Sequence, residues 1–335
     1  MTTDDVTQTT SANVVTSSSR GIEFYFQCTV VVIGIVGTAT NALILYGLVA
    51  SKQHKKHVLI FNQNLLDFFC SLALVVVYSF KLCNIYLTGS SGYWLCMLLA
   101  TENFIWCLCL ASKTNLMIVT IERYLKVVYP IWSKKILNKR VLFSAVAFAW
   151  ISAFLHNFTL TFVTSDVIDG MCYAYMIWKS PVDQVAYGLW YFLSFYVVVL
   201  VLFIFCYWRI LAVIRRQASV MAAHCAAGPS TAAQTQSSQM QTNVIKTMIL
   251  VSASYAICDM PMSIYFLILN IDPNVTLLES GYYASMFLSF LYICANPFIY
   301  ATKFDPVKRV LLGLVPCNKA SVQPVQSVEI NVACS

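Results

Sequence analysis

Apolar residues are grouped along the chain in long runs that short polar stretches separate. A helix needs about 20 such residues to cross about 30 Å of hydrocarbon. The pattern therefore predicts seven membrane-spanning helices, and the third and fifth are long enough to tilt or to extend beyond the membrane. The predicted spans are residues 24–50, 58–82, 94–128, 141–163, 185–214, 243–270 and 281–303.

The composition supports this prediction. Hydrophobic residues make up 59% of the 335 residues and charged residues only 10%, whereas a soluble domain carries about 25% charge. The net charge of +7 is spread between the apolar runs, which excludes a disordered chain and a nucleic-acid-binding protein. The predicted fold class is an all-α membrane protein, a seven-transmembrane helix bundle with a short amphipathic eighth helix.

Both ends of the chain differ from the predicted bundle at 24–304. Residues 1–23 are rich in Ser and Thr and lack the apolar core of a signal peptide, so we expect a disordered extracellular tail. Residues 305–316 have the amphipathic pattern of a helix on the inner membrane surface, where they would contact lipid, and 317–335 form a tail. Cys317 begins that tail and is either a palmitoylation site or a simple free cysteine.

The basic residues predict the orientation. Most of the 21 Lys and Arg residues fall in connections on one side of the predicted membrane, and only Arg20, Lys81 and Lys179 fall on the other. Because basic connections stay in the cytoplasm, we expect an extracellular N-terminus and a cytoplasmic C-terminus. An odd number of spans agrees with this orientation.

Characteristic residues and short motifs lie in six of the seven predicted spans, and together they carry a family resemblance. The chain resembles the rhodopsin-like (class A) G protein-coupled receptors over about residues 24–317, without resembling any one ligand subfamily. The residues that carry the resemblance are Asn41, Asp67, Glu122-Arg123-Tyr124, Trp150, Pro261 and Asn296-Pro297-Phe298-Ile299-Tyr300.

The resemblance implies a plasma-membrane receptor that is not an enzyme. Rearrangement of the helix bundle would transmit the binding of an extracellular ligand (a peptide, a lipid or another small molecule) to a heterotrimeric G protein. Two alternatives stay open. One is an ion or proton transporter or channel that uses Asp67, Lys113 and Asp259, because charges at membrane depth are costly and usually functional. The other is a receptor-fold partner that no longer signals.

Two groups of residues have roles in the family. The resemblance implies a sodium site at Asp67, Ser112 and Asn296, although Asp67 is alternatively a structural carboxylate. It also implies that Arg123 moves between its neighbour Glu122 and the tyrosines of other helices to open a G protein site; the bland alternative is an Arg that anchors a helix end. The implied switch residues are Glu122, Arg123, Tyr124, Tyr207, Asn296, Pro297 and Tyr300.

The sequence departs from the family pattern at two charged positions. Asp259 stands where family members commonly have Trp, two residues before Pro261, and Lys113 stands where an apolar residue is usual. An isolated ion in the core is very costly, so these charges should pair. Lys113 pairs with Asp259 on this interpretation, and Asp67 is the competing partner.

The resemblance also limits the ligand. Light-sensing members bind retinal through a Lys at the position of Phe290, and amine receptors use an Asp at the position of Ile105, so we expect neither retinal nor a standard amine contact. The outer cavity should be lined mostly by apolar and aromatic groups, about half of which alternatively face lipid. The predicted lining comprises Ile105, Trp106, Tyr187, Trp190, Tyr191, Tyr265, Phe266, Tyr283 and Phe290, with Glu102 and Lys81 as the nearby charged candidates.

Two covalent modifications are predicted on the outer side. The resemblance implies a disulfide between Cys96 and Cys172, with Cys83 as a competing partner. Cys96 lies two residues further from Arg123 than is usual in the family. Asn274-Val275-Thr276 is a glycosylation sequon in an outer loop.

Overall fold

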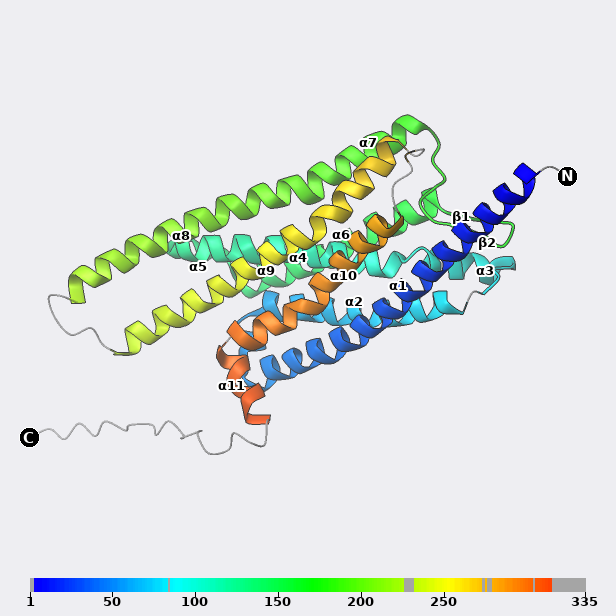
Figure 1. The fold of residues 1–335 in the computed structure, drawn as a ribbon. Helices are drawn as coiled ribbons and strands as arrows, with labels where there is room; N and C mark the ends of the chain where they lie inside the picture. The colour runs from blue at the N-terminus through cyan, green and yellow to red at the C-terminus, as the bar shows by residue number, and fades with distance from the viewer. Residues whose placement is uncertain are drawn as a thin grey trace, which may run out of the picture.

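The computed structural model describes residues 3–83, 85–225, 232–272, 275, 279–303 and 305–314. Within them, seven helical segments are long and apolar enough to cross a membrane, and they lie side by side in one bundle (Figure 1). The predicted fold class is confirmed, and each predicted span overlaps one segment. The segments are Gly21–Ala50, Val58–Leu82, Gly89–Val128, Lys139–Thr164, Pro181–Gln217, Thr242–Ile271 and Glu279–Thr302.

The elements follow one another along the chain as helices with one small hairpin. The α-helices are α1 (Thr3–Ala50), α2 (Val58–Leu82), α3 (Gly89–Leu95), α4 (Asn103–Val128), α5 (Pro130–Ile136), α6 (Lys139–Thr164), α7 (Pro181–Phe192), α8 (Val198–Cys225), α9 (Ala232–Ile271), α10 (Glu279–Lys303) and α11 (Asp305–Leu314). Short turns of other pitch are η1 (Gln53–Lys55), η2 (Cys96–Ala100) and η3 (Leu193–Val197), and the strands are β1 (Asp166–Ile168) and β2 (Met171–Tyr173).

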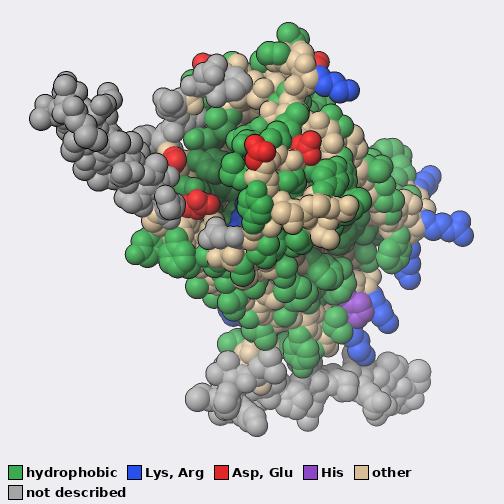
Figure 2. All heavy atoms as spheres, turned by 90° about the vertical axis from the view of Figure 1, so that its right-hand side faces the viewer, with side chains coloured by type: hydrophobic (Ala, Val, Ile, Leu, Met, Phe, Trp, Pro, Cys, Tyr) green, Lys and Arg blue, Asp and Glu red, His purple; other side chains and the backbone are tan. Residues whose placement is uncertain are grey.

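The two ends of the bundle are distinct. Strands β1 and β2 pair antiparallel near the first turns of α1, and we call this the hairpin end; α11 lies at the other, the α11 end (Figure 1). Figure 2 looks onto the hairpin end, where acidic side chains stand among apolar ones. Asp166, Asp169 and Asp183 are exposed there.

Helix α4 lies at the centre of the bundle. It packs against α2, α6 and α8, and 61% of the most apolar window of its span is buried, the largest share among the seven spans. A bilayer offers no hydrogen bonds to backbone groups, so each span stays helical. Polar side chains that α4 carries must therefore find partners on neighbouring helices.

The N-terminal segment differs from its prediction. Helix α1 begins at Thr3, whereas the sequence predicts a disordered tail over 1–23. The segment has no Gly or Pro before Gly21 to end a helix, so the helix of the first span continues towards the N-terminus. The predicted amphipathic helix corresponds to α11 (Asp305–Leu314), which packs against α1.

Candidate functional site

The predicted disulfide joins the hairpin to the third span. Cys96 and Cys172 are bonded, with their Cα atoms 5.5 Å apart, and the competing Cys83 is a free, exposed cysteine. Cys172 lies on β2 opposite Val167 of β1. The bond therefore fixes the hairpin over the end of the bundle at Cys96.

The third span is interrupted just after Cys96. Residues Cys96–Ala100 form a wide π-type turn, and Glu102 has a φ of 58°, in the left-handed region. A π turn takes up an extra residue without shifting the rest of a helix. This interruption accommodates the two additional residues between Cys96 and Arg123.

Glu102 is held in this unusual conformation by two partners from α2. Its Oε1 accepts a hydrogen bond of 2.8 Å from the Tyr78 hydroxyl and pairs with the Lys81 ammonium. A non-glycine residue at positive φ persists only where its surroundings hold it. Glu102 and Lys81, the charged groups expected near the ligand cavity, thus neutralise each other.

Most of the predicted ligand-cavity residues are buried or half-buried. Ile105 and Phe290 are fully buried, so neither side chain lines a hollow that water can enter. The Phe290 ring contacts Trp106, with centroids 6.0 Å apart. Tyr191 contacts Phe266. A separate ring contact joins Tyr265 and Tyr282.

Below these rings, Lys113 of α4 forms an ion pair with Asp259 of α9. The Lys113 Nζ lies 2.9 Å from Asp259 Oδ2, and only 9% and 8% of the two side chains are exposed. The same Oδ2 accepts a 3.0 Å hydrogen bond from Ser263. The Tyr191 and Tyr255 rings lie near the Lys113 ammonium. The sequence offers two partners for Lys113, Asp259 and Asp67, and in the structure the partner is Asp259.

Asp67 of α2 forms a second, separate buried network. Its Oδ1 accepts hydrogen bonds from Ser112 (3.0 Å) and Gln63 (3.3 Å), and its Oδ2 accepts one from Asn296 (2.9 Å). The predicted residues Asp67, Ser112 and Asn296 therefore meet. The carboxylate and hydroxyl oxygens suit a sodium ion by type, and the Asn296 Oδ1 is buried without a partner among the described residues.

A chain of amides extends this network across three helices to α6. Gln63 accepts from Asn115, whose Oδ1 accepts from Asn62, whose Oδ1 in turn accepts from the Trp150 indole. All three amide side chains are buried, and buried polar groups need such partners. Asn62, Gln63 and Asn115 lay outside the sequence predictions, although polar residues at membrane depth are a signal for them.

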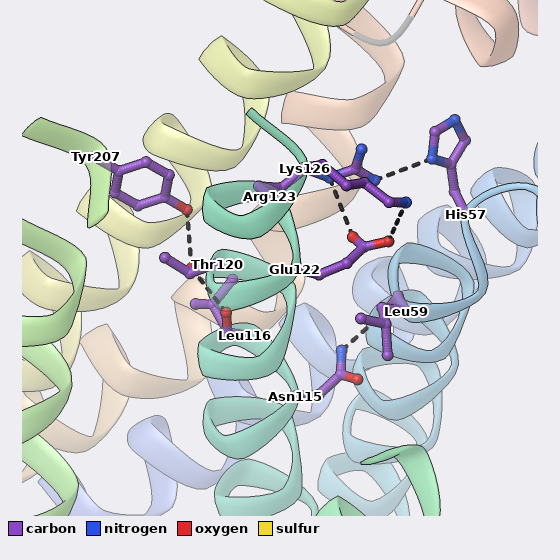
Figure 3. A network of polar contacts seen from close by, with 9 residues as sticks. All are labelled: His57, Leu59, Asn115, Leu116, Thr120, Glu122, Arg123, Lys126 and Tyr207. Atoms are coloured by element: carbon purple, nitrogen blue, oxygen red, sulfur yellow. Dashed lines mark hydrogen bonds and ion pairs between the residues drawn. The ribbon is translucent and has the colours of Figure 1, made fainter. Parts of the chain in front are cut away.

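At the α11 end, Arg123 lies between an acid and a histidine, as Figure 3 shows. Its Nε is 3.3 Å from Glu122 Oε2, and its Nη2 is 3.0 Å from His57 Nδ1. Lys126 pairs with the other oxygen of Glu122. Since a guanidinium only donates hydrogen bonds, the His57 Nδ1 accepts, and the ring faces Arg123 in its neutral form.

The predicted tyrosine partners of Arg123 are engaged elsewhere or unpaired. The Tyr207 hydroxyl bonds Thr120 and Ser252, and Figure 3 shows it apart from Arg123. Tyr300 is 1% exposed, and its hydroxyl has no hydrogen-bond partner among the described residues. Tyr124 packs its ring against Tyr129. In this structure Arg123 is therefore paired with Glu122, which is one of the two arrangements that the family resemblance implies.

His57 is a further residue that sequence reasoning does not find. It precedes α2, and burial, followed by the positive charge of Arg123, lowers its pKa from 6.5 to about 4; Lys126 and Lys56 add to this and Glu122 opposes it. A histidine in a basic connection gives no local signal of such a contact. Only the packing of α2 against α4 brings it to Arg123.

Acidification should therefore destabilise the protein through His57. The lowered pKa means that the neutral ring contributes stability at pH values above 6.5, and that this contribution is lost as the pH falls from 6.5 towards 4. We expect the melting temperature of the detergent-solubilised protein to fall more steeply over this range than that of His57→Gln. Parallel slopes for the two proteins would contradict the assignment.

Two predicted modification sites, Asn274 and Cys317, lie outside the described residues. Nothing in the geometry bears on glycosylation or palmitoylation.

Pro297 lies inside α10 and Pro261 inside α9, as the motifs predict. A proline inside a helix removes a backbone hydrogen bond and kinks it.

The family model described as "7 transmembrane receptor (rhodopsin family)" matches residues 40–300, which is most of the chain. The chain therefore belongs to the rhodopsin family of seven-transmembrane receptors, whose members are receptors and not enzymes. It is a multi-pass membrane protein. No curated protein matches it.

Proposed function

We propose that the protein is a plasma-membrane receptor that couples an extracellular ligand to a heterotrimeric G protein. The single observation that carries the proposal is the Glu122–Arg123–His57 cluster at the α11 end of a family-typical bundle. It presents a buried, always charged guanidinium at the end of the central helix. Such a charge is retained only where it is paired, and it is released when its partners move.

The proposed orientation places the hairpin end outside the cell and the α11 end in the cytoplasm. It rests on the basic residues of the connections near the α11 end and on the acidic residues at the hairpin end. The disulfide also suits an extracellular position, because disulfides persist in oxidising compartments. On this orientation the Asn274 sequon falls in an extracellular loop, where it can be glycosylated, and Cys317, three residues after α11 in the sequence, falls in the cytoplasmic tail, where it can be palmitoylated.

Activation, in this proposal, exchanges the partners of Arg123. In the resting state, Glu122 and His57 hold the guanidinium against α2 and α4. Movement of α9 about Pro261 would open the α11 end and allow Arg123 to turn towards Tyr207 and Tyr300. The Tyr300 hydroxyl, which has no hydrogen-bond partner within the described part of the chain, supports this, because a buried hydroxyl gains from a partner in the second state.

The ligand and a sodium ion would act on the bundle from the hairpin side of Arg123. A ligand at the hairpin end would contact the residues around Glu102 and Tyr191 and bias the Lys113–Asp259 pair that joins α4 to α9. If a sodium ion binds, Asp67, Ser112 and Asn296 hold it and its charge stabilises the buried carboxylate.

The transporter alternative receives no comparable support. The charges proposed for an ion relay fall into two networks, one around Asp67 and one joining Lys113 to Asp259. No hydrogen bond or ion pair links the two networks in the described part of the chain. A continuous proton path along these groups would need such a link or water between them.

The test is basal G protein activation in cells, measured with a panel of G protein subtypes. The intact chain is compared with Arg123→Ala at matched surface expression. We expect a signal for at least one subtype that Arg123→Ala abolishes, because the variant removes the group that leaves Glu122. A signal of equal size in both proteins would contradict the proposed switch.

A further inference from the structure

The Gln63 side chain of α2 lies against Asp67, at oxygens that a cation would need. Its Nε2 donates hydrogen bonds to Asp67 Oδ1 (3.3 Å) and to the Ser112 hydroxyl oxygen. The Ser112 hydroxyl donates to the same Oδ1 at 3.0 Å. A cation bound by the carboxylate and the hydroxyl would contact this pair of oxygens, and the amide N–H groups of Gln63 already point at both.

The orientation of the Gln63 amide is fixed by its neighbours. The two ends of an amide are close in shape, so the hydrogen-bond partners decide which end faces Asp67. Gln63 Oε1 accepts a 2.8 Å hydrogen bond from Asn115 Nδ2. Asn115 Nδ2 also donates to the Leu59 carbonyl (3.0 Å), and a carbonyl oxygen can only accept. The N–H end of Asn115 therefore faces Gln63, and the N–H end of Gln63 faces Asp67.

Trp150 requires the same orientation from the other end of the chain of amides. Its indole N–H, which only donates, bonds Asn62 Oδ1 (3.0 Å), and this leaves Asn62 Nδ2 to donate to Asn115 Oδ1 (2.9 Å). An inverted Gln63 amide would set its N–H against the Asn115 N–H and its carbonyl oxygen against the carboxylate. Two fixed groups, the Trp150 indole and the Leu59 carbonyl, thus agree on one arrangement.

Burial makes this arrangement costly to undo. Gln63, Asp67 and Ser112 are all buried. The carboxylate accepts from Gln63, Ser112 and Asn296, and hydrogen bonds to an ionised group are about twice as strong as neutral ones. In the low dielectric of the core, a polar group that loses its partner is costly. The amide N–H therefore stabilises the carboxylate as a bound cation would, and an entering ion must displace it.

We propose that the Gln63 amide stands in for a cation beside Asp67 and competes with sodium for the site. Asp67 and Ser112 have oxygens of a suitable type, but Gln63 directs N–H groups at the lone pairs that the ion would need. A sodium ion can enter only after the amide has turned away. The inference goes beyond the proposed function and is independent of it, because it concerns ion binding, which can be measured without a G protein.

The test is the thermal unfolding of the full chain in detergent, in sodium chloride and in choline chloride at the same ionic strength of about 0.15 M. Gln63→Met removes the N–H groups and keeps the length of the side chain. We expect this variant to melt at least about 3 °C higher in sodium, because an ion that binds only the folded state stabilises it. The unsubstituted protein should differ by less than about 1 °C between the two salts, since its amide occupies the site. Equal sodium shifts in the two proteins, including no shift in either, would overturn the proposal.

Asn62→Leu is the matched control. It also removes one buried amide from α2, but that amide bonds Asn115 and Trp150 rather than Asp67. The Leu59 carbonyl still fixes Asn115, so Gln63 keeps its orientation and the sodium shift should stay below about 1 °C. A shift as large as that of Gln63→Met would mean that the effect of sodium follows from a loosened core and not from the freed oxygens, and the assignment would be wrong.

The double variant Gln63→Met/Asp67→Asn locates the ion. Without the carboxylate the sodium shift should disappear, and a shift that persists would place the ion elsewhere and contradict the proposal. If Gln63→Met does not fold, Gln63→Ala serves in its place, and the unsubstituted protein is a test by itself. A sodium shift of at least about 3 °C in the unsubstituted protein that Asp67→Asn removes would show that the amide does not compete with the ion.

Discussion

Replacing Lys113 by Leu should destabilise the receptor by about 3–5 kcal/mol, because the substitution leaves Asp259 buried without its counter-charge. The Lys113 Nζ lies 2.9 Å from Asp259 Oδ2, and the side chains of Lys113 and Asp259 are 9% and 8% exposed. Asp259 Oδ2 also accepts a hydrogen bond from the Ser263 hydroxyl, but an uncharged hydroxyl cannot neutralise the carboxylate. For a protein of this size the melting temperature should fall by on the order of 10 °C.

The double variant Lys113→Leu/Asp259→Leu should recover most of this loss. Two apolar side chains of similar volume replace a buried ion pair at little or no net cost. The measurement is a double-mutant cycle of melting temperatures in detergent, with surface expression as a second readout. Additive losses in the cycle would show that the two residues do not act as a pair.

Lys81→Leu is the matched control for this cycle. Lys81 also pairs with a buried carboxylate, Glu102, but 25% of its side chain is exposed. Water therefore replaces part of the lost interaction, and the loss should be smaller than for Lys113→Leu. If the core pair also restrains α9, the double variant will regain its stability while its basal signalling stays altered.

Replacing His57 by Ala should raise basal G protein activation about tenfold. The 3.0 Å contact with Arg123 is a hydrogen bond to a charged group, worth about 1.5–3 kcal/mol, and about 1.4 kcal/mol corresponds to a tenfold change in a population. Of the two partners that hold the guanidinium among the described residues, removing it leaves Glu122. The population in which Arg123 has turned towards Tyr207 and Tyr300 should grow accordingly.

His54→Ala is the control, because His54 belongs to the same connection and contacts the Phe61 ring. Its basal signal should match that of the intact chain at equal surface expression. The combined variant His57→Ala/Arg123→Ala should be silent, because the released guanidinium is what signals. A His57→Ala signal no higher than that of His54→Ala would remove His57 from the switch.

Much of the fold follows from the sequence because the constraint on each span is local. A bilayer requires every backbone N–H and C=O to be satisfied within the helix, so about 20 apolar residues suffice to predict a span. Thus the apolar pattern predicts a span over 58–82, which are the bounds of α2. Two family motifs are also local: Asn-Pro-x-x-Tyr, from Asn296 to Tyr300, and Glu122-Arg123-Tyr124. They indicate the family to which the chain belongs.

Contacts between helices depend on how each helix is rotated and how its neighbours pack, which no local pattern contains. The sequence required a partner for Lys113, and only the packing of α4 against α9 chose Asp259 over Asp67. His57 and Arg123 are 66 residues apart in the sequence, and only the packing of α2 against α4 brings them together. The sequence thus dictates which helices form and which charges must pair. Which side chains meet depends on how the helices pack, because the low dielectric of the core makes each pairing obligatory and the geometry of the packing selects the partner.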